Sequence, residues 1–261
     1  MKRMVLICTL LAMGTAWAAT TGSNPTAGDR GRGGGFSIYV TKADTSGTMR
    51  LFGGVPSVVS PLKNDTTITV SQVLVGGHNP TGYLHLQGIK KDSTYFDTLL
   101  TMVGTAVTIT GSEFRVFQGA YLDTAVLGTV VIKGTGSGAS RLDTLKQGEI
   151  FTGLAVLAAG KGESPLIRQI RLSHLATQDT TDFEVRVYPT YTAYASGARG
   201  GNYYVKASAR LDKTNRERVF DQPFMLSPGS VMAAYSKVVS ASLYSVATGI
   251  TASVSFIGER R

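Results

Sequence analysis

Two pairs of aspartates lie close enough in the sequence to suggest acid–base chemistry: Asp92 with Asp97, and Asp179 with Asp182. A glycosidase needs two carboxyl groups that face each other across the scissile bond. Both pairs, however, flank turns rich in Ser and Thr. In such turns Asp commonly bonds its own backbone. We therefore interpret these aspartates as turn residues and assign them no catalytic role.

Two glycine-containing segments carry part of a catalytic or phosphate-binding motif. In Ala158-Ala159-Gly160-Lys161-Gly162 the earlier glycine is misplaced, and a glycine follows the lysine. A phosphate-binding loop needs a Ser or Thr there to hold magnesium. In the second segment, 134–138, Ser137 lies among glycines, but Thr135 breaks the spacing of a nucleophile elbow. The first segment predicts a turn between strands, and the second predicts a linker.

The three histidines, His78, His85 and His174, are far apart and have no second ligand at short spacing. A metal site needs several converging nitrogen, oxygen or sulfur ligands. His85 lies in the alternating run 83–86 and is expected to face solvent. The sequence thus indicates no catalytic residue, no metal site and no cofactor, and predicts a protein that is not an enzyme.

Residues 1–21 resemble a secretory signal. Lys2 and Arg3 form a charged start, an apolar run follows over 4–13, and Ala16-Trp17-Ala18 is a small-x-small cleavage site. The alternative is an apolar N-terminal segment of an assembly protein that stays in the cytosol. Cleavage would remove the only cysteine, Cys8, and so exclude disulfides. No later segment is long and apolar enough for a membrane span.

The composition favours strands and a surface that contacts other subunits. Charged residues make up 16% of the 261 residues, against roughly 25% in typical soluble domains. The net charge is +9, but the positive residues are dispersed and are not interleaved with stacking aromatics. We therefore expect no specific nucleic-acid site. A general affinity for anionic surfaces stays open.

The chain after residue 35 consists of short apolar runs separated by turn residues, at the spacing of sandwiches and barrels. This pattern predicts an all-β fold. The clearest alternation is in 182–188, which places apolar residues on one face and charged residues on the other: Phe183, Val185 and Val187 against Glu184 and Arg186. The predicted strands are 36–40, 66–75, 82–86, 106–110, 113–122, 128–133, 150–157, 166–172, 183–188, 203–209, 231–236 and 250–257. Seven residues are predicted to share one core: Ile170, Leu172, Phe183, Val185, Val187, Val254 and Phe256.

The predicted organisation has four parts: the signal-like or apolar segment 1–21, a flexible Gly-rich arm over 22–35, a β domain over 36–137 and a β-sandwich domain over 145–261. One or two antiparallel β-sandwich or jelly-roll units are expected after the arm, and two units would be separated at the Gly/Ser segment 134–138. The arm has no apolar residues to bury, so it is expected to be a strap that becomes ordered on a neighbouring subunit.

Tyrosine is frequent, with 11 copies, and several lie near predicted turns: Tyr188, Tyr191, Tyr194, Tyr203 and Tyr204. Aromatic side chains in such places fill subunit interfaces or stack on sugars. They also occur as ordinary surface residues of edge strands. The sequence leaves these three interpretations open.

The second half of the chain carries turn and strand motifs that resemble a known family. They are 158–161, 166–173, 183–189, the turn-containing segment 223–230 and the closing strand 250–258. Together they resemble the C-terminal β domain of virion structural proteins of tailed bacteriophages, especially marine ones. In that family a small-Ala-Gly-Lys turn leads into a sandwich strand, and a Pro-Gly-Ser turn enters a late strand. The resemblance covers roughly 150–261 and, more faintly, 82–133.

The resemblance implies a capsid-associated, decoration or tail-associated subunit that is located in the virion and has no catalytic residues. The expected partners are further copies of the chain, as a homo-oligomer, and other virion proteins. Virion proteins assemble in the host cytoplasm, so the signal-like start points to an alternative. That alternative is a secreted, periplasmic or cell-surface protein, such as an appendage subunit, that binds glycans.

Overall fold

The computed structural model describes residues 35–44, 47–53, 68–74, 82–102, 107–108, 114–122, 128–134, 141–145, 151–174, 179–195, 202–240 and 250–261. Strands dominate these ranges, and their one helix, α1 (Tyr191–Ala195), is little more than a turn. The predicted all-β class is confirmed. The segment 1–21 and all of the predicted arm except Gly35 lie outside the described residues.

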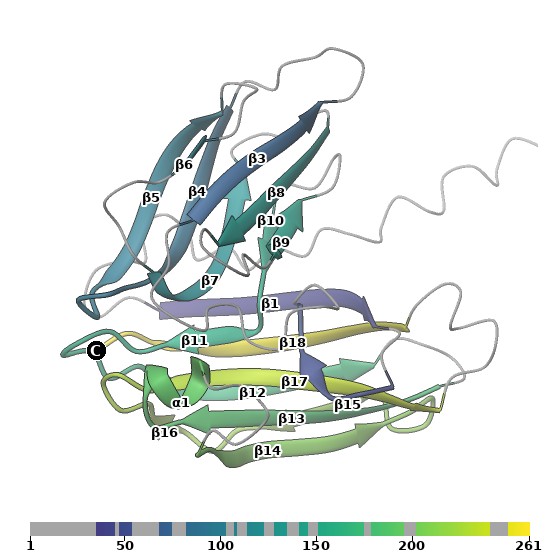
Figure 1. Cartoon of the computed structure of the whole chain (residues 1–261). Helices are drawn as coiled ribbons and strands as arrows, with labels where there is room; N and C mark the ends of the chain where they lie inside the picture. The colour runs from purple at the N-terminus through teal and green to yellow at the C-terminus, as the bar shows by residue number, and fades with distance from the viewer. Residues whose placement is uncertain are drawn as a thin grey trace, which may run out of the picture.

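Two antiparallel sheets form the larger of two sandwiches (Figure 1). The strands of the first sheet, in spatial order, are β1 (Gly35–Asp44), β18 (Ile250–Glu259), β12 (Leu166–His174) and β15 (Glu217–Phe220), with β16 (Phe224–Met225) also on β12. Those of the second are β11 (Val156–Ala158), β17 (Val231–Ser240), β13 (Thr180–Tyr188) and β14 (Tyr204–Leu211), with β2 (Arg50–Leu51) on β17. Their inward faces share one apolar core.

The smaller sandwich is also built from two sheets. One contains, in spatial order, β10 (Phe151–Gly153), β7 (Phe114–Leu122), β4 (Gly82–Lys90) and β5 (Tyr95–Met102). The other contains β6 (Val107–Thr108), β3 (Ile68–Leu74), β8 (Gly128–Gly134) and β9 (Arg141–Leu145). Most of the predicted strands therefore exist, and their ends lie within four residues of the expected bounds. Five strands were not predicted, because their sequences contain too few alternating apolar residues: β2, β5, β9, β15 and β16.

The sheets do not follow the division of the sequence at 36–137 and 145–261. β1 pairs along its whole length with β18, from Gly35 opposite Glu259 to Asp44 opposite Ile250. Beyond the Gly/Ser segment, β9 and β10 pair back onto β8 and β7. The smaller sandwich is thus inserted between β2 and β11. Alternation reveals a strand but does not specify which distant strand supplies its backbone partners, and so the sequence could not show this insertion.

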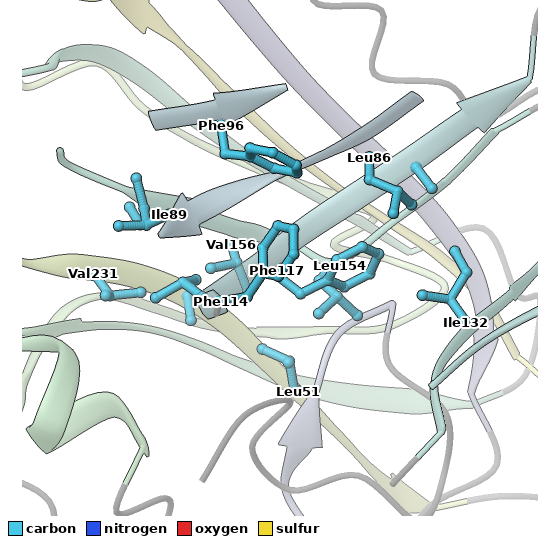
Figure 2. Close-up of a cluster of buried hydrophobic side chains, with 14 of the residues drawn as sticks. Leu51, Leu86, Ile89, Phe96, Phe114, Phe117, Ile132, Leu154, Val156 and Val231 are labelled. Carbon is cyan, nitrogen blue, oxygen red and sulfur yellow. The ribbon is translucent and has the colours of Figure 1, made fainter. Parts of the chain in front are cut away.

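The segment from Leu154 to Ala159 is buried on both faces, and each face packs in a different hydrophobic cluster. Leu154, Val156 and Ala158 belong to one buried cluster, which includes Phe114 and Phe117 of the smaller sandwich. The intervening residues belong to the core of the larger sandwich: Ala155, Leu157 and Ala159. β17 divides in the same way, with Val231, Ala233 and Tyr235 in the first cluster and Met232 and Ala234 in the second. Figure 2 shows how the first cluster brings together side chains from both sandwiches.

The predicted core of the larger sandwich is confirmed. All seven predicted residues are at most 2% exposed and lie in one cluster. Phe183 packs against Phe52, with ring centroids 5.9 Å apart.

Replacing Phe183 with alanine is expected to lower the free energy of unfolding by about 3–5 kcal/mol, because the site is too tightly packed to collapse around the cavity. Chemical denaturation followed by circular dichroism measures this loss. Ser208→Ala, at an exposed position of the neighbouring strand β14, is the control and should change the free energy by less than about 0.5 kcal/mol. A loss below about 1 kcal/mol for Phe183→Ala would contradict the assigned core.

Candidate binding surface at the free edge of the larger sandwich

Asp92 and Asp182, two of the four aspartates considered for catalysis, each have a hydrogen-bond partner. Asp92 accepts hydrogen bonds from the backbone N–H and the hydroxyl of Thr94, at 2.9 and 2.6 Å. These bonds lower the pKa of Asp92, and they confirm it as a turn residue. Asp182 instead bonds Arg210, with Nε 2.7 Å from Oδ1. Asp97 lies in β5, and Asp179 is buried just before β13.

The Gly-Lys segment is a turn, as predicted. Its backbone N–H groups already have protein acceptors: Lys161 donates to the carbonyl oxygen of Ser93 at 2.7 Å, and Gly160 donates to Glu163 at 3.1 Å. Arg260 binds the same Glu163 oxygen at 2.8 Å. Donors that are engaged in this way do not form a cradle for phosphate, so the segment acts as a joint between the β4–β5 turn and the larger sandwich.

The histidines lie in different surroundings, and the described residues contain no group of three metal-ligating side chains. His78 is outside the described ranges. His85 is half-buried on β4 rather than fully turned to solvent. His174 is fully buried at the end of β12, with Nδ1 3.2 Å from the hydroxyl of Thr181. Burial lowers the pKa of His174 and outweighs the opposing effect of nearby Asp179.

The tyrosines divide into a buried and an exposed group. Tyr188, Tyr191 and Tyr194 are buried together with Tyr235. The Tyr188 hydroxyl donates to the Tyr235 hydroxyl at 2.8 Å, and the ring of Tyr188 meets Tyr194 edge-on at 5.4 Å. Burial raises the pKa of Tyr191 to about 12, and its hydroxyl donates to the carbonyl oxygen of Ala159. These three predicted residues are therefore structural and are not available to a ligand.

Arg186 connects the buried tyrosines to the surface. Its guanidinium lies between the rings of Tyr203 and Tyr235, 4.5 and 4.4 Å from their centroids. Nε and Nη2 donate to Glu184, at 2.8 and 2.6 Å. The residue is 6% exposed, and its Nη1 makes no hydrogen bond. Glu184 fixes the guanidinium of Arg186, and the contact of this guanidinium with the ring of Tyr203 holds Tyr203 in place directly before β14.

The exposed group belongs to a larger apolar surface. Tyr204, Val205 and Met225 are 54%, 46% and 55% exposed, and Tyr203 is 39% exposed. Lys206 places its ammonium 4.2 Å from the centroid of the Phe224 ring, which joins β14 to β16. We call this set the edge surface: Tyr203, Tyr204, Val205, Lys206, Phe224 and Met225. Exposed apolar residues gathered in this way commonly mark an interaction site.

The backbone of β14 is also open to a partner. Among the described strands it pairs only with β13, and it ends its sheet. In Figure 1 it lies on the side of the larger sandwich away from the smaller one. An edge strand presents a row of unpaired N–H and C=O groups, to which another strand can add. The edge surface therefore combines exposed apolar side chains with free backbone hydrogen-bonding groups.

Basic residues outnumber acidic ones along this edge. The hairpin from β14 to β15 contains Lys206, Arg210, Lys213, Arg216 and Arg218 against Asp212 and Glu217. Asp212 accepts hydrogen bonds from the turn N–H groups of Thr214 and Asn215, both at 2.8 Å. Glu217 is bound by Arg171 of β12. Five basic residues against two acidic ones leave the hairpin with surplus positive charge, and of the five Arg210 is itself bound to Asp182.

No family model matches the sequence, and no curated protein matches it.

Sequence reasoning had singled out Tyr203 and Tyr204 but missed Val205, Lys206, Phe224 and Met225. One available signal was the consecutive run Tyr203-Tyr204-Val205, because a strand with one solvated face should alternate. The approach of β16 to β14 left no signal in the sequence.

The Arg186 stack predicts a difference between two arginines that both bind a carboxylate. Arg186→Ala is expected to lower the free energy of unfolding by about 2 kcal/mol or more, because it removes a buried charged hydrogen bond and two stacked rings lose their partner. Arg210→Ala is the matched control. Its side chain is 64% exposed, so the loss should stay below about 1 kcal/mol. Equal losses in denaturant titrations would contradict the structural role of the stack.

The buried His174 predicts a dependence of stability on pH. Its folded-state pKa lies below the ordinary 6.5, so the unfolded chain takes up the proton first as the pH falls. The free energy of unfolding should therefore be constant above about pH 6.5 and fall below it, by at most about 1.4 kcal/mol per pH unit from this group. Urea titrations from pH 7.5 to 5 should show a shallower fall for His174→Gln. The same fall in both proteins would contradict the assignment.

Proposed function

We propose that this chain is a structural protein of a tailed-phage virion that works in repeated copies as a capsid-associated, decoration or tail-associated subunit. The turn and strand motifs of the C-terminal half, which resemble those of tailed-phage virion proteins, support the proposal. The proposal assigns the chain no catalysis, metal or cofactor. Within the described ranges no helix is long and apolar enough to cross a membrane.

The observation that carries the proposal is the edge surface. A free β14 edge flanked by four exposed apolar residues is a poor solution for a monomer in water, because it exposes both apolar area and unpaired backbone groups. Contact with another subunit would cover both. A particle subunit has such a neighbour at every copy.

The double-sided core supports the same role. The junction between the two sandwiches is apolar and continuous, from Phe114 and Phe117 to Val231 and Tyr235. A large apolar interface between domains favours a fixed relative orientation. A subunit that presents its free edge at a fixed distance from its other sandwich is suited to a repeating lattice.

The signal-like residues 1–21 favour a second candidate, a secreted cell-surface or appendage protein that binds glycans. The two candidates differ in where the chain is found and where it begins. For the virion protein we expect tailed particles, purified on density gradients from cells that carry the gene, to contain the chain in stoichiometric amounts. N-terminal sequencing should then find residues 1–18 retained.

Mass spectrometry of the purified particles and of the washed cell surface shows in which of the two the chain is found. Particles that lack the chain, with a form beginning at Ala19 on the surface or in the medium, would overturn the virion proposal and support the secreted protein.

A further inference from the structure

We infer that the edge surface binds an extended, acidic strand of a different protein, which pairs with β14. This inference rests on the proposed function, because it takes the chain to be a subunit that docks on other proteins. It adds the chemistry of the partner and the way in which that partner binds.

Strand pairing is the binding mode that the geometry of β14 offers. The strand has eight residues, from Tyr204 to Leu211, and pairs only with β13 among the described strands. Past the register shift at Lys206, alternate N–H and C=O groups along its outer side therefore point away from the sheet. A partner in extended conformation satisfies these groups in a row, which supplies affinity without a preformed pocket.

The apolar residues supply contacts for the side chains of such a strand. Tyr204 pairs with Val187, whose side chain is in the core, so Tyr204 lies on the inward side of the sheet at the open margin of the sandwich. Val205 pairs with Arg186 and lies on the outward side. A partner strand added here meets apolar surface on both of its faces. Tyr203, held by the Arg186 stack, marks one end of this surface.

The charge decides against a second copy of the chain. Lys206 and Arg210 are the charged residues of β14, so a second copy paired there would bring positive charges close together, and like charges on adjacent strands repel. Lysine on an edge strand is also a common means of preventing self-pairing. An acidic strand would instead be attracted to the basic residues of the edge. This attraction would orient the partner and raise its rate of association.

The test uses the full chain and a labelled, end-capped peptide of the same length as β14 in which Glu alternates with Val. Fluorescence anisotropy should show saturable binding of this peptide. A control peptide of the same length, in which Lys alternates with Val, should not bind. Lys206→Glu and Tyr204→Ser are each expected to weaken binding by about 10-fold or more. Circular dichroism melting checks that both variants fold.

Matched controls lie on the smaller sandwich. Lys133→Glu makes the same change of net charge at an exposed position of β8, and Leu99→Ser removes an apolar side chain that is 54% exposed, like Tyr204. Both should bind the peptide within about 2-fold of the wild type. If Lys206→Glu and Lys133→Glu weaken peptide binding equally, the inference is overturned, because binding then depends on the total charge of the protein and not on the edge surface.

Two further peptides test the backbone pairing. Since alternate residues of a strand point their N–H groups to opposite edges, N-methylation of every Glu blocks one edge and N-methylation of every Val blocks the other. One peptide should lose binding by about 10-fold or more, and the other should retain it. Equal binding of the two would overturn strand pairing.

Heparin serves as the probe for an anionic polysaccharide. If heparin binds in a manner that depends on Lys206 while the Glu–Val peptide does not bind, the edge surface binds glycans and the inference is overturned. Absence of peptide binding, with the chain present in particles, would overturn only the partner assigned here. Peptide binding by a chain that is absent from particles would overturn the virion proposal and leave the docking mode standing.

Discussion

The structure depends on one stretch of chain that is buried on both faces. From Leu154 to Ala159 every residue is at most 1% exposed, and successive side chains enter two different cores. Backbone bonds hold the stretch in register: Leu154 donates to Gln118 of the smaller sandwich at 3.2 Å, and Ala155 donates to Phe52 of the larger one at 3.0 Å. A shift by one residue would exchange the two sets of side chains. The small alanines are needed because both sides are closely packed.

This shared segment explains why the free edge lies where it does. The smaller sandwich covers the side of the larger one that contains β1 and β11, as Figure 1 shows, and leaves β14 as the open end of its sheet. The buried tyrosines extend from the junction toward that end: Tyr235 lies in the cluster shared with the smaller sandwich, and through Arg186 it contacts Tyr203 at the edge surface. The position of the edge surface is thus coupled by direct contacts to the junction. Tyr203 is held there by its contacts with Arg186 and with the ring of Tyr188.

Parts of the candidate site could be predicted, and others could not. The alternation in 182–188 placed Phe183, Val185 and Val187 in one core correctly, because a period of two has only one geometric solution. The same pattern put Arg186 on the opposite face but could not show that this face is covered there by Tyr203 and Tyr235. The frequency of tyrosine left open a subunit interface, a sugar-stacking site and ordinary surface positions. It did not show which members are buried, because burial depends on strands that are distant in sequence.

The sequence by itself determined the class of fold, the positions of most strands, the core face of the second sandwich and the turn at Lys161. These follow from local periodicity and turn chemistry, which act over a few residues. Only the tertiary structure decided that β1 pairs with β18, that the smaller sandwich is inserted between β2 and β11, and that β14 is left as an edge beside β16. Backbone hydrogen-bonding groups are the same in every residue except proline, which lacks the N–H. The choice of partner strand is therefore made by the packing of whole faces against each other, which no short stretch of sequence contains.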